Sequence, residues 1–209
     1  SLNWTSVYGD MKGTPSYVKR AFERAYEMLE KYDATDKVTL FYNDYDTYFE
    51  VEDLLALVNF INEGEKAKIC SGIGMQSHVD VKRPTIEEYG AALEKFMAAG
   101  YEVQITELDF TINFDTDGTD KKDPSYDYKN EGETIEEQAA FVKDFMEMVI
   151  AKQKNRDKTV SPKGITGLTI WGLYDSISWR GKSQPLLFGT SIDDPKPAFQ
   201  AFLEASRTK

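Results

Sequence analysis

Residues 101–109 of the chain have the sequence Tyr-Glu-Val-Gln-Ile-Thr-Glu-Leu-Asp. The β-branched and apolar residues at its start predict a buried β-strand, and Gly100, directly before it, is typical of the end of a helix. Two acidic residues, Glu107 and Asp109, close the stretch. Either one could cap a helix or lie on the surface, but a glutamate directly after a buried strand is poorly placed for solvation. The stretch therefore predicts a strand that delivers carboxylates to a functional site.

The same alternation of strand and helix extends along the chain in both directions. Thr85 and Thr134 each begin a capping-box sequence, Thr-Ile-Glu-Glu, which predicts the start of a helix. Thr14 followed by Pro15 predicts an earlier start, with proline in the first helical position. We expect strands at residues 38–43, 69–75, 101–106 and 165–173, and helices at residues 15–33, 54–63, 86–99, 135–149 and 197–205.

Strands that alternate with helices predict an α/β fold with a parallel sheet and right-handed crossovers. Two architectures fit this order, an open doubly wound sheet and a closed (β/α) barrel. No glycine-rich phosphate loop follows any predicted strand, which disfavours a nucleotide-binding enzyme such as a dehydrogenase. No linker or low-complexity segment divides the 209 residues, so we expect one domain or a large piece of one.

Composition excludes several classes of partner. The net charge of −11 argues against nucleic acid or an anionic membrane surface, and no apolar stretch approaches the ~20 residues of a membrane helix. One histidine and one cysteine leave only carboxylates as metal ligands, so we expect no metal and no cofactor. The acidic segment from Asp115 to Asp120 lacks the spacing of a calcium loop. Cys70 lies in an apolar run and is expected to be a buried, inert thiol.

Polar and aromatic side chains gather where the predicted strands end. In parallel α/β folds the active site lies at these carboxyl ends, so four strands that deliver such groups indicate one site. A single histidine is more often structural, and tryptophans near strand ends are often core residues. The four groups are residues 43–46, 76–78, 107–109 and 171–175, with Trp179 close behind.

Carboxylates beside tryptophans favour carbohydrate chemistry. Glycosidic bonds are cleaved by a pair of carboxylates, and the C–H faces of sugars pack on aromatic rings. A serine or cysteine nucleophile is disfavoured, because the Gly-x-Ser-x-Gly turn is absent.

Five blocks of the sequence, in order, resemble glycoside hydrolase family 10, the endo-1,4-β-xylanases built on a TIM (β/α)₈ barrel. The blocks are residues 41–46, 72–78, 105–109, 171–179 and 185–188. The resemblance implies retaining hydrolysis of the β-1,4-xylan backbone. It also implies that residues 1–209 are the C-terminal portion of one catalytic domain, with barrel strands 5–8, their helices and the helix after strand 4.

The resemblance also implies a role for each site residue. Glu107 matches the catalytic nucleophile, His78 matches the histidine that hydrogen-bonds it, and Asp109 matches the carboxylate that supports this network. The other matching residues bind substrate: Asn43 and Tyr45 on the leaving-group side, Gln76 beside His78, Trp171 and Trp179 as walls of the sugar sites, and Arg180 toward the glycone side.

One part of the family pattern is missing. The general acid/base glutamate, in an Asn-Glu pair at the end of strand 4, would precede residue 1, as would the first four strands. Residue 1 is Ser rather than Met, so we expect a processed or cut chain. The N-terminal half of the barrel is expected in a second chain or lost fragment, and the chain alone is expected to be inactive.

The alternative interpretation is a non-catalytic or vestigial half-barrel that binds carbohydrate. Because polymeric xylan does not enter cells, the resemblance implies an extracellular, periplasmic or cell-surface location, although residues 1–4 do not resemble a signal peptide.

Overall fold

The structure is a computed structural model that describes residues 15–113 and 132–207. These residues form a five-stranded sheet with the order β1-β2-β4-β3, in which β5 also pairs with β4 and every pairing is parallel. The strands are β1 (Phe41–Asp44), β2 (Gly72–Met75), β3 (His78–Asp80), β4 (Glu102–Thr111) and β5 (Ile165–Ile170). The helices are α1 (Ser16–Lys31), α2 (Val51–Asn62), α3 (Ile86–Ala98), α4 (Ile135–Asn155) and α5 (Pro197–Ser206). The predicted alternation of strands and helices is confirmed.

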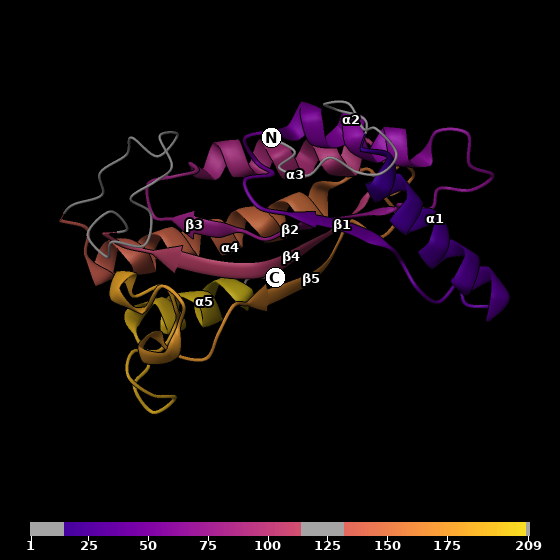
Figure 1. The fold of residues 1–209 in the computed structure, drawn as a ribbon. Helices are drawn as coiled ribbons and strands as arrows, with labels where there is room; N and C mark the ends of the chain where they lie inside the picture. The colour runs from indigo at the N-terminus through magenta and orange to yellow at the C-terminus, as the bar shows by residue number, and fades with distance from the viewer. Residues whose placement is uncertain (1–14, 114–131, 208–209) are drawn as a thin grey trace.

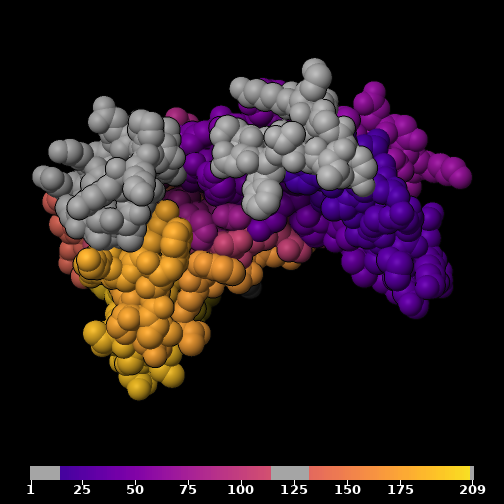
Figure 2. Space-filling view, viewed as in Figure 1, coloured from indigo at the N-terminus to yellow at the C-terminus, as the bar shows by residue number. Residues whose placement is uncertain are grey.

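The helices cover one face of this sheet, as in one sector of a (β/α) barrel, rather than both faces, as in a doubly wound fold (Figure 1). Ile73, Met75, Val103 and Ile105 are fully buried in the core that faces these helices. On the opposite face, Asn43 and Thr166 are exposed and Gln104 is half-buried. In Figure 2, α1 projects at one end of the molecule and the segment that follows β5 projects at the other, which gives a hollowed outline.

The strand predicted at residues 69–75 is shorter than expected at its start and is continued by another strand. β2 begins at Gly72, so Cys70 precedes it rather than lying in mid-strand. Ser77, with a φ of 68°, separates β2 from β3, and both pair with the same neighbour, Met75 with Ile105 and His78 with Asp109. Because of this break, the strand that begins at His78 pairs with the carboxyl half of β4. Burial raises the pKa of Cys70 to about 11, as expected for an inert thiol.

The starts of α3 and α4 and the ends of α2 and α3 follow the sequence closely. The Thr85 and Thr134 hydroxyls accept from the backbone N–H groups of Glu88 and Glu137, and both capping boxes are complete. Gly64 and Gly100 take φ values of 76° and 77°, which only glycine adopts without strain, directly after α2 and α3.

Three predicted helix bounds were wrong: α1 begins one residue later than predicted, α2 begins at Val51 rather than at residue 54, and α4 continues to Asn155 rather than ending at residue 149. Pro15 occupies the N-cap of α1 instead of its first turn, and the predicted cap, Thr14, lies outside the described residues. In the described part of the chain, no helix combines the length and apolarity required to cross a bilayer.

Two glycines in β2 leave space for side chains of the neighbouring strand β1. A Cβ on Gly72 would lie 2.3 Å from the Phe41 ring, and a Cβ on Gly74 would lie 2.6 Å from Asn43 Oδ1. Such distances are far inside van der Waals contact. The missing side chains therefore allow Phe41 and Asn43 of β1 to lie across β2, toward β4.

Candidate active site

The candidate site centres on the carboxyl half of β4. Glu107 and Asp109 were predicted to follow a strand, but β4 continues to Thr111, so both lie within it. From Ile105 to Leu108, three residue steps of β4 pair with only two steps of β5, from Leu168 to Ile170. This bulge breaks the alternation of side chains, and Glu107 stays accessible at 18% exposure while Asp109 is completely buried.

The side chain of Glu107 is held from two sides. Asn43 Nδ2 donates to its Oε1 at 3.1 Å, and His78 Nε2 lies 3.4 Å from its Oε2. The amide of Asn43 is itself oriented, because its Oδ1 accepts a hydrogen bond from the Thr106 hydroxyl at 2.6 Å. The carboxylate plane is thus fixed, yet each oxygen keeps lone-pair capacity beyond these single contacts.

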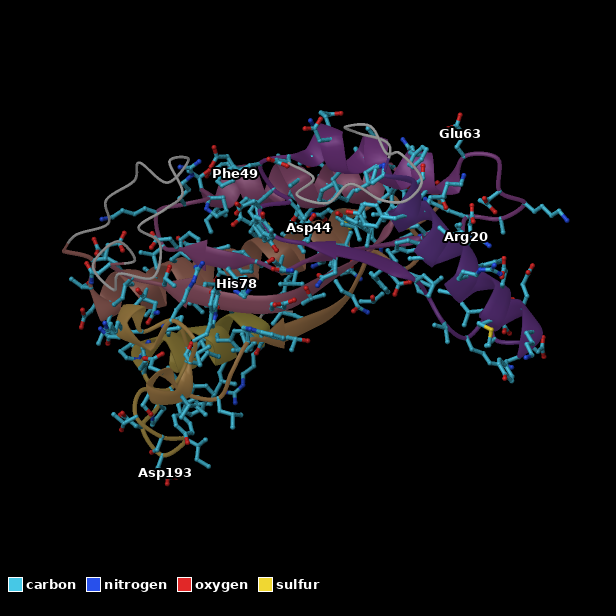
Figure 3. All side chains as sticks on the ribbon, viewed as in Figure 1. Arg20, Asp44, Phe49, Glu63, His78 and Asp193 are labelled. Carbon is cyan, nitrogen blue, oxygen red and sulfur yellow. The ribbon has the colours of Figure 1, made fainter. Side chains whose placement is uncertain are left out.

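His78 is oriented by a buried carboxylate behind it. Its Nδ1 lies 2.9 Å from Asp109 Oδ2, which also accepts from the Trp179 indole Nε1 at 3.0 Å. With Nδ1 bound to Asp109, the ring presents Nε2 to Glu107. The imidazole also packs edge-on against Trp179, at a centroid distance of 4.8 Å. The lone histidine of the sequence therefore links both acidic residues, and Figure 3 places it near the segment that follows β5.

Aromatic side chains border this carboxylate network. Trp171 and Trp179 are 46% and 53% exposed, although both were also candidates for the core. Trp171 is anchored through its backbone N–H, which donates to Leu108 O at 2.9 Å, and its ring lies 6.5 Å from the His78 ring. The guanidinium of Arg180 stacks over Trp179 at 4.1 Å. The rim thus offers flat apolar surfaces to a ligand beside Glu107.

Tyr45 and Gln76, predicted to bind substrate, make no polar side-chain contact with Glu107. Among the described residues, the polar contacts of the Glu107 side chain come from Asn43 and His78 rather than from Tyr45 or Gln76. Gln76 contributes its backbone carbonyl, which accepts from the Glu107 N–H at 2.9 Å. Tyr45, which directly follows β1, is 65% exposed.

Sequence reasoning missed Thr106 and Gly74. Thr106 orients Asn43 and Gly74 makes room for it, and both act across neighbouring strands. The alternation of Gly72 and Gly74 within a predicted strand was a usable signal, because glycine in a strand often marks the close approach of another group.

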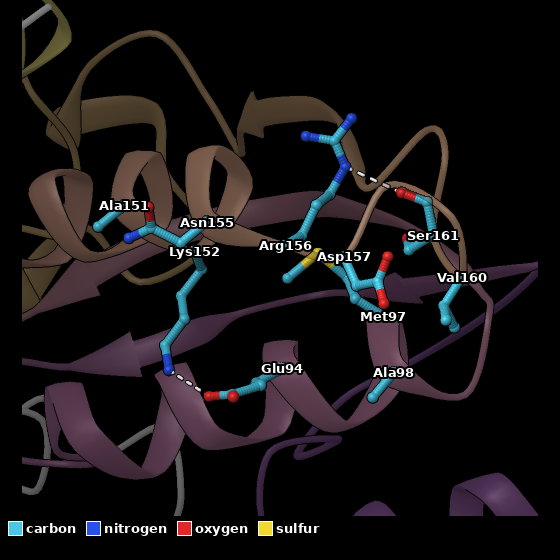
Figure 4. Close-up of a pocket in the computed structure, with 10 residues that line it drawn as sticks. All are labelled: Glu94, Met97, Ala98, Ala151, Lys152, Asn155, Arg156, Asp157, Val160 and Ser161. Carbon is cyan, nitrogen blue, oxygen red and sulfur yellow. Dashed lines mark hydrogen bonds and ion pairs between the residues drawn. The ribbon is translucent and has the colours of Figure 1, made fainter.

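Other candidate features lie away from this site. The described residues contain no group of three or more His, Cys, Asp or Glu side chains placed to hold a metal ion, and the segment from Asp115 to Asp120 falls outside them. A cavity of about 500 Å³ lies between the C-terminal ends of α3 and α4 (Figure 4). Its Lys152–Glu94 ion pair, at 2.6 Å, is at the end of the sheet opposite to His78.

Comparisons with known proteins show the family of the chain. A family model described as "Glycosyl hydrolase family 10" matches residues 3–205. Endo-1,4-beta-xylanase A of Butyrivibrio fibrisolvens is 39% identical over 97% of this chain, and an endo-1,4-beta-xylanase of Geobacillus stearothermophilus is 31% identical over 95% of it. The chain spans 42% of the first relative and 54% of the second, so it corresponds to about half of their length.

Solved structures give the same result. A thermostable mutant of the xylanase Xyn10A from Cellvibrio japonicus superposes with a TM-score of 0.65 at 29% identity, over 91% of this chain and 54% of the other. The CBM22-1–GH10 modules of Clostridium thermocellum Xyn10B, in complex with xylohexaose, superpose with a TM-score of 0.72 at 28% identity, over 99% of this chain and 34% of the other. The chain therefore belongs to glycosyl hydrolase family 10, and its parallel sheet with covering helices is a part of that family's (β/α)₈ barrel.

Proposed function

We propose that this chain is the nucleophile-bearing half of a retaining endo-1,4-β-xylanase, and that residues 1–209 are the C-terminal portion of one catalytic domain. The observation that carries the proposal is the position of Glu107. It is clamped between Asn43 and His78, accessible, and bordered by the exposed rings of Trp171 and Trp179. The xylanase names of the family relatives support the choice of substrate.

In the first chemical step, an oxygen of Glu107 attacks the anomeric carbon of a xylose unit. The bond from that carbon to the leaving sugar oxygen breaks while a glycosyl ester forms on Glu107. Asn43 and His78 hold the carboxylate in its attacking orientation, and Asp109 holds His78. Water then cleaves the ester and restores the carboxylate, so the configuration at the anomeric carbon is retained.

Sugar binding is assigned to the rim. Trp171 and Trp179 are placed to pack on the C–H faces of xylose units, with Arg180 backing Trp179. Asn43 and Tyr45 are assigned to the leaving-group side, with Gln76 next to them at the start of the turn before His78.

A general acid must protonate the leaving oxygen, and we propose that it is a glutamate outside this chain. Its carrier would be the N-terminal half of the barrel, in a second chain or a fragment separated from this one. That half would pair with the edges of β1 and β5 and cover the face that carries Asn43, Gln104 and Thr166. General acid/base help is typically worth roughly 10²–10⁴ in rate, so this chain alone is expected to be nearly inactive.

Location follows from the substrate only. A polymer such as xylan is degraded outside the cell, which supports an extracellular, periplasmic or cell-surface enzyme. One similar solved structure is that of an intracellular xylanase from Thermoanaerobacterium saccharolyticum, so the proposed location rests on the substrate and not on the family.

The test is hydrolysis of xylohexaose by the whole protein, meaning this chain together with the N-terminal half of the barrel, and by its Glu107→Gln variant. We expect turnover by the first and almost none by the second. A 2-fluoro-xylobioside with a dinitrophenyl leaving group needs no acid for its departure, and it should label Glu107 covalently in the whole protein. A well-folded whole protein that binds xylohexaose without turnover or labelling would instead support the non-catalytic carbohydrate-binding half-barrel.

A further inference from the structure

A buried ion pair lies behind the aromatic rim, outside the carboxylate network. Lys196 precedes α5 and Asp175 begins a short 3-10 turn, η2 (Asp175–Ile177), and their residues are only 7% and 6% exposed. Lys196 Nζ lies 2.9 Å from Asp175 Oδ2. The same ammonium donates to Gln184 O at 2.6 Å and to Leu186 O at 2.8 Å. All three N–H donors of the lysine are therefore used within one loop.

The aspartate completes the same set of contacts. Its Oδ1 accepts from the Leu186 N–H at 2.7 Å, while its Oδ2 binds Lys196. Burial raises the pKa of Asp175 and lowers that of Lys196, so desolvation acts against both charges. An ion pair buried at such a cost is weak support for stability and is better suited to specifying one conformation of the loop.

The loop that this pair holds is the one that carries Trp179 and Arg180. These residues lie between Asp175 and a second 3-10 turn, η3 (Gly181–Ser183). The two turns are in close contact, because a Cβ on Gly181 would lie 2.5 Å from Asp175 O. A change in the position of Asp175 would therefore shift the nearby backbone that carries the Trp179 indole.

The far side of the loop is docked on β4. The Phe110 and Ile112 N–H groups donate to Pro185 O and Ser183 O, at 2.8 and 2.9 Å. Buried Gln138 of α4 donates to Gln184 O at 2.7 Å, the carbonyl that Lys196 also binds. Lys196 therefore ties the turn that carries Trp179 to a segment that is itself fixed on the catalytic strand.

We propose that Lys196 and Asp175 are positioning residues that hold the Trp179 indole on Asp109, and through Asp109 and His78 set the orientation of Glu107. The path consists of the 3.0 Å bond from Trp179 to Asp109, the 2.9 Å contact from Asp109 to His78 and the 3.4 Å contact from His78 to Glu107. The catalytic part of this inference rests on the proposed function, whereas the structural part concerns the indole alone.

The experiment compares Lys196→Met with the double variant Asp175→Asn/Lys196→Met in the whole protein. The single change leaves a buried carboxylate without its cation and can prevent folding. The double change removes both charges, keeps an amide oxygen for the Leu186 N–H, and leaves Gln138 on the Gln184 carbonyl. Hydrogen exchange of the Trp179 indole N–H, assigned in ¹⁵N spectra with Trp179→Phe, reports the bond to Asp109 without any need for turnover.

We expect the double variant to exchange its Trp179 indole proton at least about tenfold faster, since the loop opens locally more often. Its kcat on xylo-oligosaccharides should fall about tenfold or more, with a smaller change in KM, because the nucleophile loses orientation rather than substrate contacts. Lys152→Met removes an ion pair at the opposite end of the sheet and should change neither readout.

A folded double variant that keeps wild-type indole exchange overturns the proposal, whatever its activity. Faster indole exchange with an unchanged kcat overturns the catalytic part. A wild-type protein without turnover refutes the proposed function instead, and the indole exchange still decides whether the ion pair holds Trp179.

Discussion

Two glutamates on the same strand, Glu102 and Glu107, have opposite environments. At the amino end of β4, Glu102 accepts from Thr39 at 2.9 Å, from Lys163 at 2.6 Å and from Thr166 at 2.7 Å. At the carboxyl half, Glu107 has two longer contacts, 3.1 Å to Asn43 and 3.4 Å to His78. Both side chains are mostly buried, at 10% and 18% exposure.

The difference separates a structural carboxylate from the proposed nucleophile. Burial opposes the ionisation of Glu102, but the hydrogen bonds from Lys163, Thr166 and Thr39 outweigh it and hold its pKa below the ordinary value. Its lone pairs are used by Thr39, which precedes β1, by Lys163, which precedes β5, and by Thr166 within β5. The neighbours of Glu107 orient its carboxylate but leave lone pairs of both oxygens available, as an attacking nucleophile requires.

The largest effect should come from a matched pair of variants at these two glutamates. Glu107→Gln keeps the shape of the side chain but removes the proposed nucleophile, so kcat of the whole protein should fall at least about 10³-fold. Glu102→Gln should cost about 1–3 kcal/mol in the free energy of unfolding and leave kcat nearly unchanged. Activity assays and urea unfolding check both; equal losses of kcat in two folded variants would refute the comparison.

The next effect concerns His78, which holds the proposed nucleophile. His78→Ala should lower kcat by about 10²-fold with little change in KM, because Glu107 loses its alignment while the tryptophan walls remain. Steady-state kinetics on xylohexaose provide the measurement. A loss of less than threefold would mean that Asn43 alone holds the carboxylate.

A smaller effect should come from filling the space that Asn43 uses. Gly74→Ala places a methyl group against Asn43 Oδ1, and Gly72→Ala places one against the Phe41 ring. Each should cost about 1–3 kcal/mol of stability by overpacking. Only Gly74→Ala should also lower kcat, by about tenfold, because it displaces the amide that holds Glu107. Equal kcat values for the two folded variants would remove Asn43 from the mechanism.

The smallest effect is the pH dependence of the Glu102 contacts. The folded-state pKa of Glu102 is lowered, so its contribution to stability is present above the unfolded-state pKa and is lost as pH falls through the folded-state value. Lys163→Met should reduce this contribution by up to about 1 kcal/mol, because Lys163 is largely exposed. Urea unfolding of both proteins from pH 3 to 7 should show a difference that shrinks toward low pH; a constant difference would contradict the assignment.

Much of the fold was predictable because its signals are local. Capping boxes at Thr85 and Thr134 and glycines after α2 and α3 mark helix ends by hydrogen bonding and backbone sterics within a few residues. The length of β4 was underestimated, because Glu107 and Asp109 were interpreted as following the strand, although residues 107–111 alternate polar and apolar side chains. That half exists because β3 pairs with it on one side and residues 183–185 on the other.

The sequence by itself determined which polar and aromatic side chains gather at one end of the sheet, because the apolar pattern locates the strands. It placed Glu107, Asp109, His78 and the two tryptophans at one edge of a parallel sheet. Only the tertiary structure decided how they meet. Asn43 reaches Glu107 across Gly74, and Lys196 reaches the loop of Trp179, through contacts between segments far apart in the chain. Strand register and side-chain packing set such contacts, and neither is encoded in the local periodicity from which the elements were predicted.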